Sequence, residues 1–149
     1  MLKKYKIGFD GIGLLLFLVI MIPNIIWFVV PAPDDVLRTE SVTGIIDSIA
    51  SVCQVLMVAS LCLTLNRNTP EPKVTGTIIT VITCIFLYYL CWLCYYQGNA
   101  DKAVLMGLTV LPCAAFLLYS YERRNILTAF FAGIFSVCHL IYAVVNYII

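Results

Sequence analysis

Long runs of apolar residues alternate with short polar segments along the chain. The apolar runs predict five membrane-spanning helices, because about 20 apolar residues in helical form cross the hydrocarbon core of a bilayer. Their expected ranges are 7–30, 44–65, 77–97, 103–121 and 126–149. Because the connections are short, neighbouring helices are expected to run antiparallel. The sequence therefore predicts an all-α integral membrane protein, with a single bundle of five transmembrane helices forming one domain over residues 1–149.

The composition supports this class of protein. Hydrophobic residues make up 62% of the 149 residues and charged residues only 11%, whereas a soluble domain carries about 25% charged residues. The run 7–30 is longer than the apolar core of a signal peptide, which spans about 7–15 residues, so we expect it to be retained. No basic patch is large enough to suggest nucleic acid. The expected partners are the lipid bilayer, a membrane-protein partner and a second copy of this chain.

The distribution of basic residues predicts the orientation in the membrane. If the N-terminus is cytoplasmic, the inner segments hold seven basic residues and the outer segments hold two. The seven are Lys3, Lys4, Lys6, Arg67, Lys73, Arg123 and Arg124, and the two are Arg38 and Lys102. Cytoplasmic loops carry the excess of Lys and Arg, so we expect the N-terminus in the cytoplasm and the C-terminus outside. Compact loops without organelle or retention signals suggest a bacterial cytoplasmic membrane.

Four of the five apolar runs carry a stripe of small or polar residues at intervals of three and four, which places each stripe on one helix face. Polar groups are costly in hydrocarbon, so these faces are expected to meet. The residues expected to line a shared polar cavity are Asn24, Asp47, Gln54, Tyr88, Tyr95, His139 and Asn146. Three of them (Gln54, Tyr88 and His139) fall near the membrane midplane at about 1.5 Å per residue. The cavity is expected to open outward and to bind a small-molecule or lipidic ligand, or to assist its transport.

The same stripes also have a purely structural interpretation, because small and polar residues are what membrane helices use to pack together. In that case the protein is a non-catalytic accessory subunit of a larger membrane complex. His139 then serves as a neutral, hydrogen-bonded ring instead of a proton-handling group. Asp47 caps its helix or pairs with Arg38. Asp10 is expected at the inner interface near the basic N-terminus, without a chemical role.

The seven cysteines all lie within apolar runs, where a free cysteine packs as a small hydrophobe. Cys91 and Cys94 form a CxxC near the outer end of their span. This motif resembles the pairs of membrane thiol oxidoreductases of the vitamin K epoxide reductase and DsbB kind, and the resemblance implies redox catalysis through these two residues. Those enzymes also use a second cysteine pair in an outer loop, whereas no loop of this chain contains cysteine. Redox catalysis is therefore the lesser alternative.

Other catalytic and metal-binding signals are absent from the sequence. It contains no HExxH, GxSxG or P-loop motif and no paired carboxylates. A single histidine leaves no cluster of His, Asp and Glu for a metal ion. The sequence therefore favours a non-enzymatic role and predicts neither a metal nor a cofactor.

Overall fold

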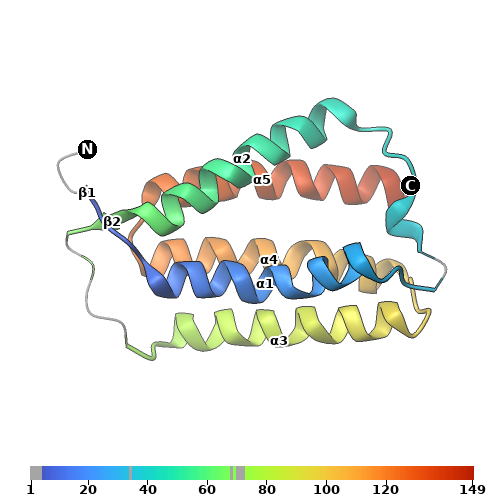
Figure 1. The fold of residues 1–149 in the computed structure, drawn as a ribbon, viewed down its shortest axis with the longest axis horizontal. Coiled ribbons are helices and arrows are strands. Elements are labelled where there is room, and N and C mark those ends of the chain that lie inside the picture. Colours follow the sequence, from blue (N-terminus) through green and yellow to red (C-terminus); the bar gives the residue numbers. More distant parts are fainter. Residues whose placement is uncertain (1–4, 34, 68, 70–72) are drawn as a thin grey trace.

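The computed structural model describes residues 5–33, 35–67, 69 and 73–149, so Lys3 and Lys4 of the basic N-terminus lie outside the described residues. Five helices make up most of the structure (Figure 1). They are α1 (Gly11–Val29), α2 (Gly44–Leu63), α3 (Gly76–Tyr96), α4 (Lys102–Glu122) and α5 (Ile126–Ala143). Each is long and apolar enough to cross a membrane, α5 together with the turn that follows it. The chain is a multi-pass membrane protein.

A two-stranded ribbon lies at one end of the helices, which we call the β end. Strand β1 (Tyr5–Ile7) pairs antiparallel with β2 (Thr64–Asn66), and the backbone N–H of Asp10 continues the pairing. The expectation of helix over residues 7–10 and 64–65 is therefore wrong, and the fold is not purely α-helical. The reason is that main-chain pairing with a distant segment satisfies the same backbone groups that a longer helix would satisfy.

The opposite end, which we call the loop end, holds the α1–α2 connection, the tight α3–α4 turn and the C-terminus (Figure 1). The connection contains one short 3₁₀ helix, η2 (Val36–Arg38). Helix α5 was expected to continue to residue 149, but beyond Ala143 it widens into a π-helical turn, η3 (Val144–Ile148). Helix α3 ends at Tyr96, and two residues later Gly98 adopts a φ of 85°, which is accessible to glycine and lets the backbone reverse direction.

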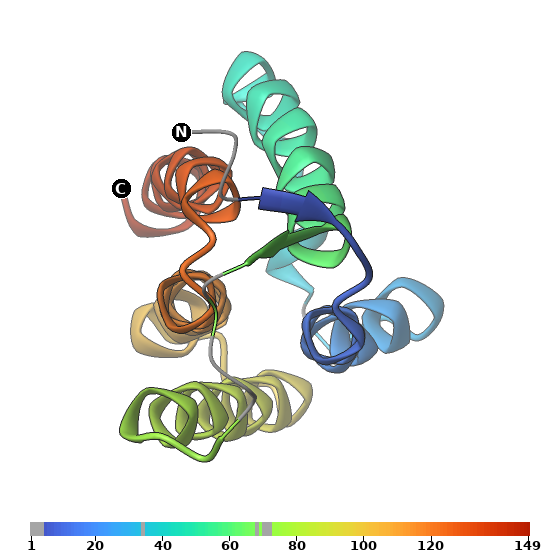
Figure 2. The ribbon, with the colours of Figure 1, turned by 90° about the vertical axis from the view of Figure 1, so that its left-hand side faces the viewer.

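The helices pack in the order α2, α5, α4, α3, with each packed along the next, and α1 lies more loosely across α2 and α3. Viewed from the β end, the five helices surround a common centre (Figure 2). Towards the loop end α2 diverges from α1 (Figure 1). The best-packed part of the core includes Met57, Ala115 and Ala132, all fully buried.

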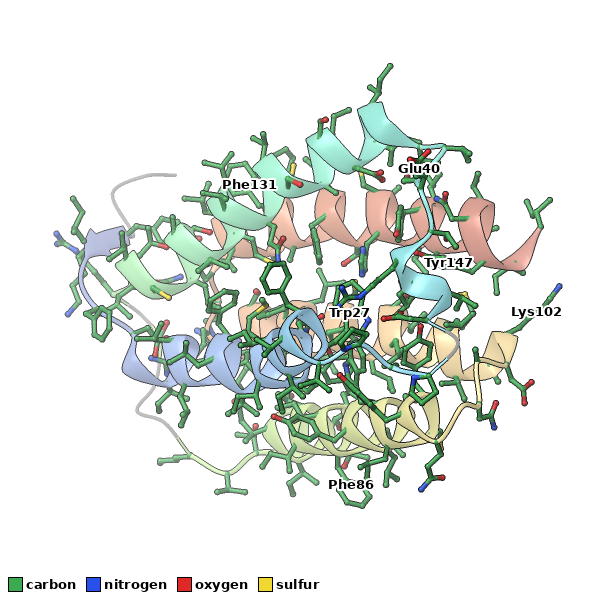
Figure 3. All side chains as sticks on the ribbon, turned by 45° about the vertical axis from the view of Figure 1, so that its right-hand side comes forward. Trp27, Glu40, Phe86, Lys102, Phe131 and Tyr147 are labelled. Atoms are coloured by element: carbon green, nitrogen blue, oxygen red, sulfur yellow. The ribbon has the colours of Figure 1, made fainter. Side chains whose placement is uncertain are left out.

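Side-chain directions match a helical protein surrounded by lipid. Phe86 points away from the other helices, whereas Trp27 points into the space between them (Figure 3).

Proline in α1 is accommodated by a neighbouring helix. Pro23 cannot donate to the carbonyl of Val19, and the hydroxyl of Tyr89 on α3 donates to that carbonyl instead, at 2.7 Å. This replacement bond, typical of membrane helices, also joins α3 to α1.

A candidate binding cavity among the five helices

A cavity with a volume of about 430 Å³ is lined by side chains from all five helices and from the α1–α2 connection. This volume lies within the range of about 300–1,000 Å³ typical of small-molecule sites. The lining residues are Ile20, Met21, Asn24, Ser41, Asp47, Ala50, Ser51, Gln54, Tyr88, Leu108, Pro112, Phe116, Phe135, His139 and Tyr142. The cavity extends from the middle of the helices to the loop end.

Five of the seven residues expected from the polar stripes line this cavity. They are Asn24, Asp47, Gln54, Tyr88 and His139, contributed by α1, α2, α3 and α5. The other two, Tyr95 and Asn146, lie outside the lining and hold the surrounding structure in place. The structure thus brings five of the seven predicted residues together around one cavity. Tyr95 and Asn146 share helix faces with lining residues but do not line the cavity.

Asp47 lies in the first turn of α2 and is the only charged side chain among the described lining residues. Its two carboxylate oxygens accept hydrogen bonds from the hydroxyls of Ser41, at 2.5 Å, and Thr43, at 2.9 Å. These bonds tie the carboxylate to the start of its own helix, close to the capping role that the sequence suggested. The alternative partner, Arg38, instead pairs with Asp35 at 3.0 Å.

Asn24 and Tyr88 meet across the cavity wall and join α1 to α3. The side-chain amide of Asn24 donates both to the Tyr88 hydroxyl, at 2.6 Å, and to the Ile20 carbonyl, at 3.0 Å. The donation to a carbonyl fixes which end of the amide carries nitrogen. The amide oxygen of Asn24 has no hydrogen-bond partner within the described part of the chain, so it is an available acceptor at the cavity wall.

His139 lies half-buried between two aromatic rings of α5. It stacks on Phe135, with ring centroids 5.1 Å apart, and on Tyr142, at 6.1 Å. The expected hydrogen bond from His139 to another helix is absent among the described residues, so stacking fixes the ring while its nitrogen atoms remain available. The side-chain amide of Gln54 is likewise without a partner there. These two residues contribute polar groups that are not used in packing.

Sequence reasoning missed the apolar part of the cavity. Its seven apolar side chains are those of Ile20, Met21, Ala50, Leu108, Pro112, Phe116 and Phe135. Helix α4 was not expected to contribute, because it lacks a polar stripe. Pro112 near its middle was the available signal, since a proline removes one helical hydrogen bond. Here it leaves the Leu108 carbonyl without its usual partner at the cavity wall.

Tyr95 anchors the α1–α2 connection. Its hydroxyl donates to the Asp35 carboxylate at 2.7 Å and accepts from the Leu37 backbone N–H at 3.1 Å. The indole N–H of Trp27 also donates to Asp35, at 2.8 and 3.0 Å. Burial raises the pKa of the Asp35 carboxyl, but hydrogen bonds from Tyr95, Trp27 and Arg38 outweigh this effect and hold its pKa below the usual value. Asp35 is therefore the centre of a hydrogen-bonded cluster at the loop end, formed with Trp27, Arg38 and Tyr95, which we call the clasp.

Asn146 supports Asp47 from the outside of the cavity. Its side-chain amide donates to the Thr43 hydroxyl at 3.0 Å, and Thr43 in turn donates to Asp47. Its amide oxygen accepts from the Val42 backbone N–H at 3.0 Å. Asn146 thus fastens the start of α2 to the end of α5. Nearby, the hydroxyls of Tyr142 and Tyr147 form a short hydrogen bond, and Tyr147 lies beside the connection (Figure 3).

A second polar cluster lies at the β end, where the sequence assigned no role. Asp10 is buried and caps α1 by accepting from the backbone N–H groups of Ile12 and Gly13. It also accepts from the Tyr119 hydroxyl, at 3.1 and 3.2 Å, and pairs with Arg123, at 3.2 Å. Asp10 is therefore enclosed by hydrogen-bond donors and a positive charge at the β end. It fastens α1 to the end of α4.

Cys91 and Cys94 lie on the unbroken helix α3, and all seven cysteines are free thiols. Cys91 packs so closely on Gly107 of α4 that a side chain at Gly107 would overlap its sulfur. This contact gives Cys91 a structural role in the α3–α4 interface. Neither cysteine lines the cavity. Within the described part of the chain, no group of His, Cys, Asp and Glu is arranged to hold a metal ion.

Comparison with known proteins adds no relative: no protein-family model, curated protein or solved structure matches this chain.

Proposed function

We propose that this protein binds a small amphipathic or lipidic molecule in the cavity among its five helices, as a binding protein or as a component that assists transport. The observation that carries the proposal is the cavity lining itself. Asp47, Gln54 and His139 bring polar groups to a space that is also lined by seven apolar side chains. Small-molecule binding sites combine apolar walls with a few convergent polar groups in this way.

We further propose that the helices form one transmembrane bundle with the N-terminus in the cytoplasm and the C-terminus outside. The excess of basic residues at the β end and in the loops on that side supports this orientation. The loop end, with Asp47 and Ser41, then faces outward, and the cavity opens away from the cytoplasm. A bacterial cytoplasmic membrane remains our proposed location.

A second candidate function is that of a non-catalytic accessory subunit held by a larger membrane protein or by a second copy of the chain. Part of the polar pattern favours it. Thr128 on α5 donates to the Ser60 hydroxyl on α2 at 3.1 Å, and both are buried away from the cavity. Hydroxyl contacts of this kind hold membrane helices together. The two functions differ in whether the cavity admits a small molecule.

Whether the cavity admits a small molecule can be tested at the single histidine of the sequence, His139. Diethyl pyrocarbonate modifies a histidine that it can reach. The protein is purified in mild detergent with a tag that lacks histidine, and modification is located by peptide mass spectrometry. Ala50→Phe fills the cavity from α2. Ile49→Phe is the matched control, because Ile49 is adjacent, 46% exposed and outside the lining.

We expect wild type and Ile49→Phe to react at His139 at the same rate, and Ala50→Phe to react at least about tenfold more slowly because the added ring occupies the cavity. An unreactive His139 in wild type, or one rate for all three proteins, would overturn the proposal in favour of the accessory role. Size-exclusion chromatography verifies that each variant is folded and monodisperse.

A further inference from the structure

The hydrogen bonds around the cavity leave it rich in acceptors. Both amide protons of Asn24, a lining residue, are donated to Ile20 and Tyr88, and its amide oxygen has no hydrogen-bond partner among the described residues. The hydroxyl proton of Ser51 is donated to the Asp47 carbonyl at 2.9 Å, which leaves the Ser51 oxygen as an acceptor. Pro112 leaves the Leu108 carbonyl without its usual donor. A molecule that fills this space meets several oxygen atoms that can accept a hydrogen bond.

The formal charge of the cavity also favours a hydrogen-bond donor. Asp47 carries a formal negative charge, and each of its carboxylate oxygens accepts one hydroxyl, so lone pairs remain for a further donor. The two ion pairs among the described residues are Arg38–Asp35 and Arg123–Asp10, so no basic side chain there pairs with Asp47. A carboxylate at the mouth of a cavity with apolar walls is stabilised when a positive group accompanies it.

The apolar walls set the other half of the ligand. Ile20, Phe116 and Phe135 lie nearer the middle of the helices, whereas Ser41 and Asp47 lie at the loop end. A bound molecule would therefore place an apolar body at membrane depth and a polar group at the mouth. This arrangement of apolar and polar side chains selects an amphipathic ligand whose polar group lies towards Asp47.

Resting on the proposed function, we infer that the cavity selects an amphipathic ammonium compound, with an alkylammonium group donating to Asp47 and Asn24 and an apolar body against Phe116 and Phe135. The ammonium group supplies a positive charge opposite Asp47 and N–H donors for the acceptor oxygens of Asp47 and Asn24. A free hydrophobic amine and the ethanolamine headgroup of a lipid share this chemistry.

A matched set of three probes tests the inference: 4-phenylbutylamine, 4-phenylbutan-1-ol and 5-phenylpentanoate. At pH 7 the first is a cation, because alkylamines have a pKa of about 10, the second is neutral and the third is an anion. Binding is measured by isothermal titration calorimetry to the purified protein in a maltoside detergent. Asp47→Asn removes the charge of the cavity, and Glu40→Gln removes the charge of an exposed carboxylate outside it.

We expect wild type and Glu40→Gln to bind the amine at least about tenfold more tightly than the alcohol, as a charge-assisted hydrogen bond implies, and to bind the carboxylate most weakly. Asp47→Asn should lose this preference and bind the amine no more tightly than the alcohol. The ranking on wild type tests the inference even if Asp47→Asn does not fold. In nanodiscs, displacement of the amine by added phosphatidylethanolamine would identify the headgroup as the source, and its absence a free amine.

The inference and the proposed function fail in different ways. Equal binding of all three probes, or tighter binding of the carboxylate, would overturn the ammonium preference while leaving a functioning cavity. Binding of no probe, together with an unreactive His139, would overturn the cavity as a binding site and the inference with it.

Discussion

Asp10 and Arg123 form an ion pair at 3.2 Å between two residues that are 113 positions apart in the chain. The Asp10 carboxylate is 6% exposed and also caps α1 and accepts from Tyr119. Arg123, just beyond the end of α4, thereby ties the first helix to the fourth. Because α1 packs loosely on its other neighbours, this pair is a main attachment of its β end.

Replacing Asp10 with Asn should therefore destabilise the protein strongly. Breaking a buried ion pair leaves an uncompensated charge and costs about 3 kcal/mol at the low end of measured values. Asp10→Asn and Arg123→Gln should each lower the thermal unfolding midpoint in detergent, and the double variant should lower it by less than the sum of the two. The exposed Asp101 and Arg124 provide controls, Asp101→Asn and Arg124→Gln, that should leave the midpoint unchanged. Additive effects of the two single variants would show that the pair is not coupled.

The contact between Cys91 and Gly107 predicts a compensating pair of substitutions. Gly107→Ala places a methyl group into the Cys91 sulfur, and overpacking of this kind costs about 1–3 kcal/mol. Cys91→Ala in the same chain should restore much of the lost stability, because it removes the overlapping sulfur. Gly133→Ala on α5 has open space around it and serves as the control. Thermal unfolding of Gly107→Ala, of the double variant and of Gly133→Ala measures the effect. Failure of Cys91→Ala to rescue Gly107→Ala would contradict the close contact between Cys91 and Gly107.

The clasp around Asp35 predicts a pH dependence in the acid range only. The pKa of Asp35 lies below its ordinary value of 3.8, so its contribution to stability is fully present above that pH and is lost as the pH falls through the lowered pKa. Trp27 donates to this carboxylate, so its fluorescence reports the clasp once Trp92→Phe has removed the other tryptophan. Emission should stay constant from pH 7 to about 4.5 and shift only below the usual carboxylate range. Asp35→Asn should show the shifted emission throughout; a transition near pH 6 would contradict this assignment.

The proposed orientation predicts opposite results for reporters at the two ends of the molecule. Alkaline phosphatase is active only outside the cytoplasm, so a fusion after Ile149 should be active and a fusion in the α2–α3 loop after Thr69 should be inactive. Green fluorescent protein fused at the same two points should give the inverse pattern. The reverse result at both points would show that the loop end faces the cytoplasm.

The sequence predicted the five helices well, because hydrocarbon-facing side chains produce long apolar runs that no loop interrupts. It failed where backbone pairing replaced helix, at Ile7 and Thr64, since three residues carry too little periodicity to separate strand from helix. Helical spacing predicted that Asn24, Asp47 and His139 lie on facing helix surfaces, and the three line one cavity in the structure. It did not separate them from Tyr95, because one helix face spans both the cavity and its supporting contacts.

Two further features were inaccessible from the sequence for physical reasons. The apolar wall on α4, including Phe116, looks the same as a lipid-facing surface when only residue type is considered. The partner of Asp10 was inaccessible because an ion pair between chain-distant residues depends on how the helices are arranged, which apolar periodicity does not specify.

The most direct test of the central claim, that the cavity holds a molecule, is native mass spectrometry of the protein released from mild detergent. Wild type and the lipid-facing control Ile49→Phe should retain one additional mass per chain, and the cavity-filling variant Ala50→Phe should lose it. His139→Ala should retain it more weakly than wild type. An empty wild-type protein, or one that carries the same bound lipid as Ala50→Phe, would contradict the binding role and favour the accessory subunit.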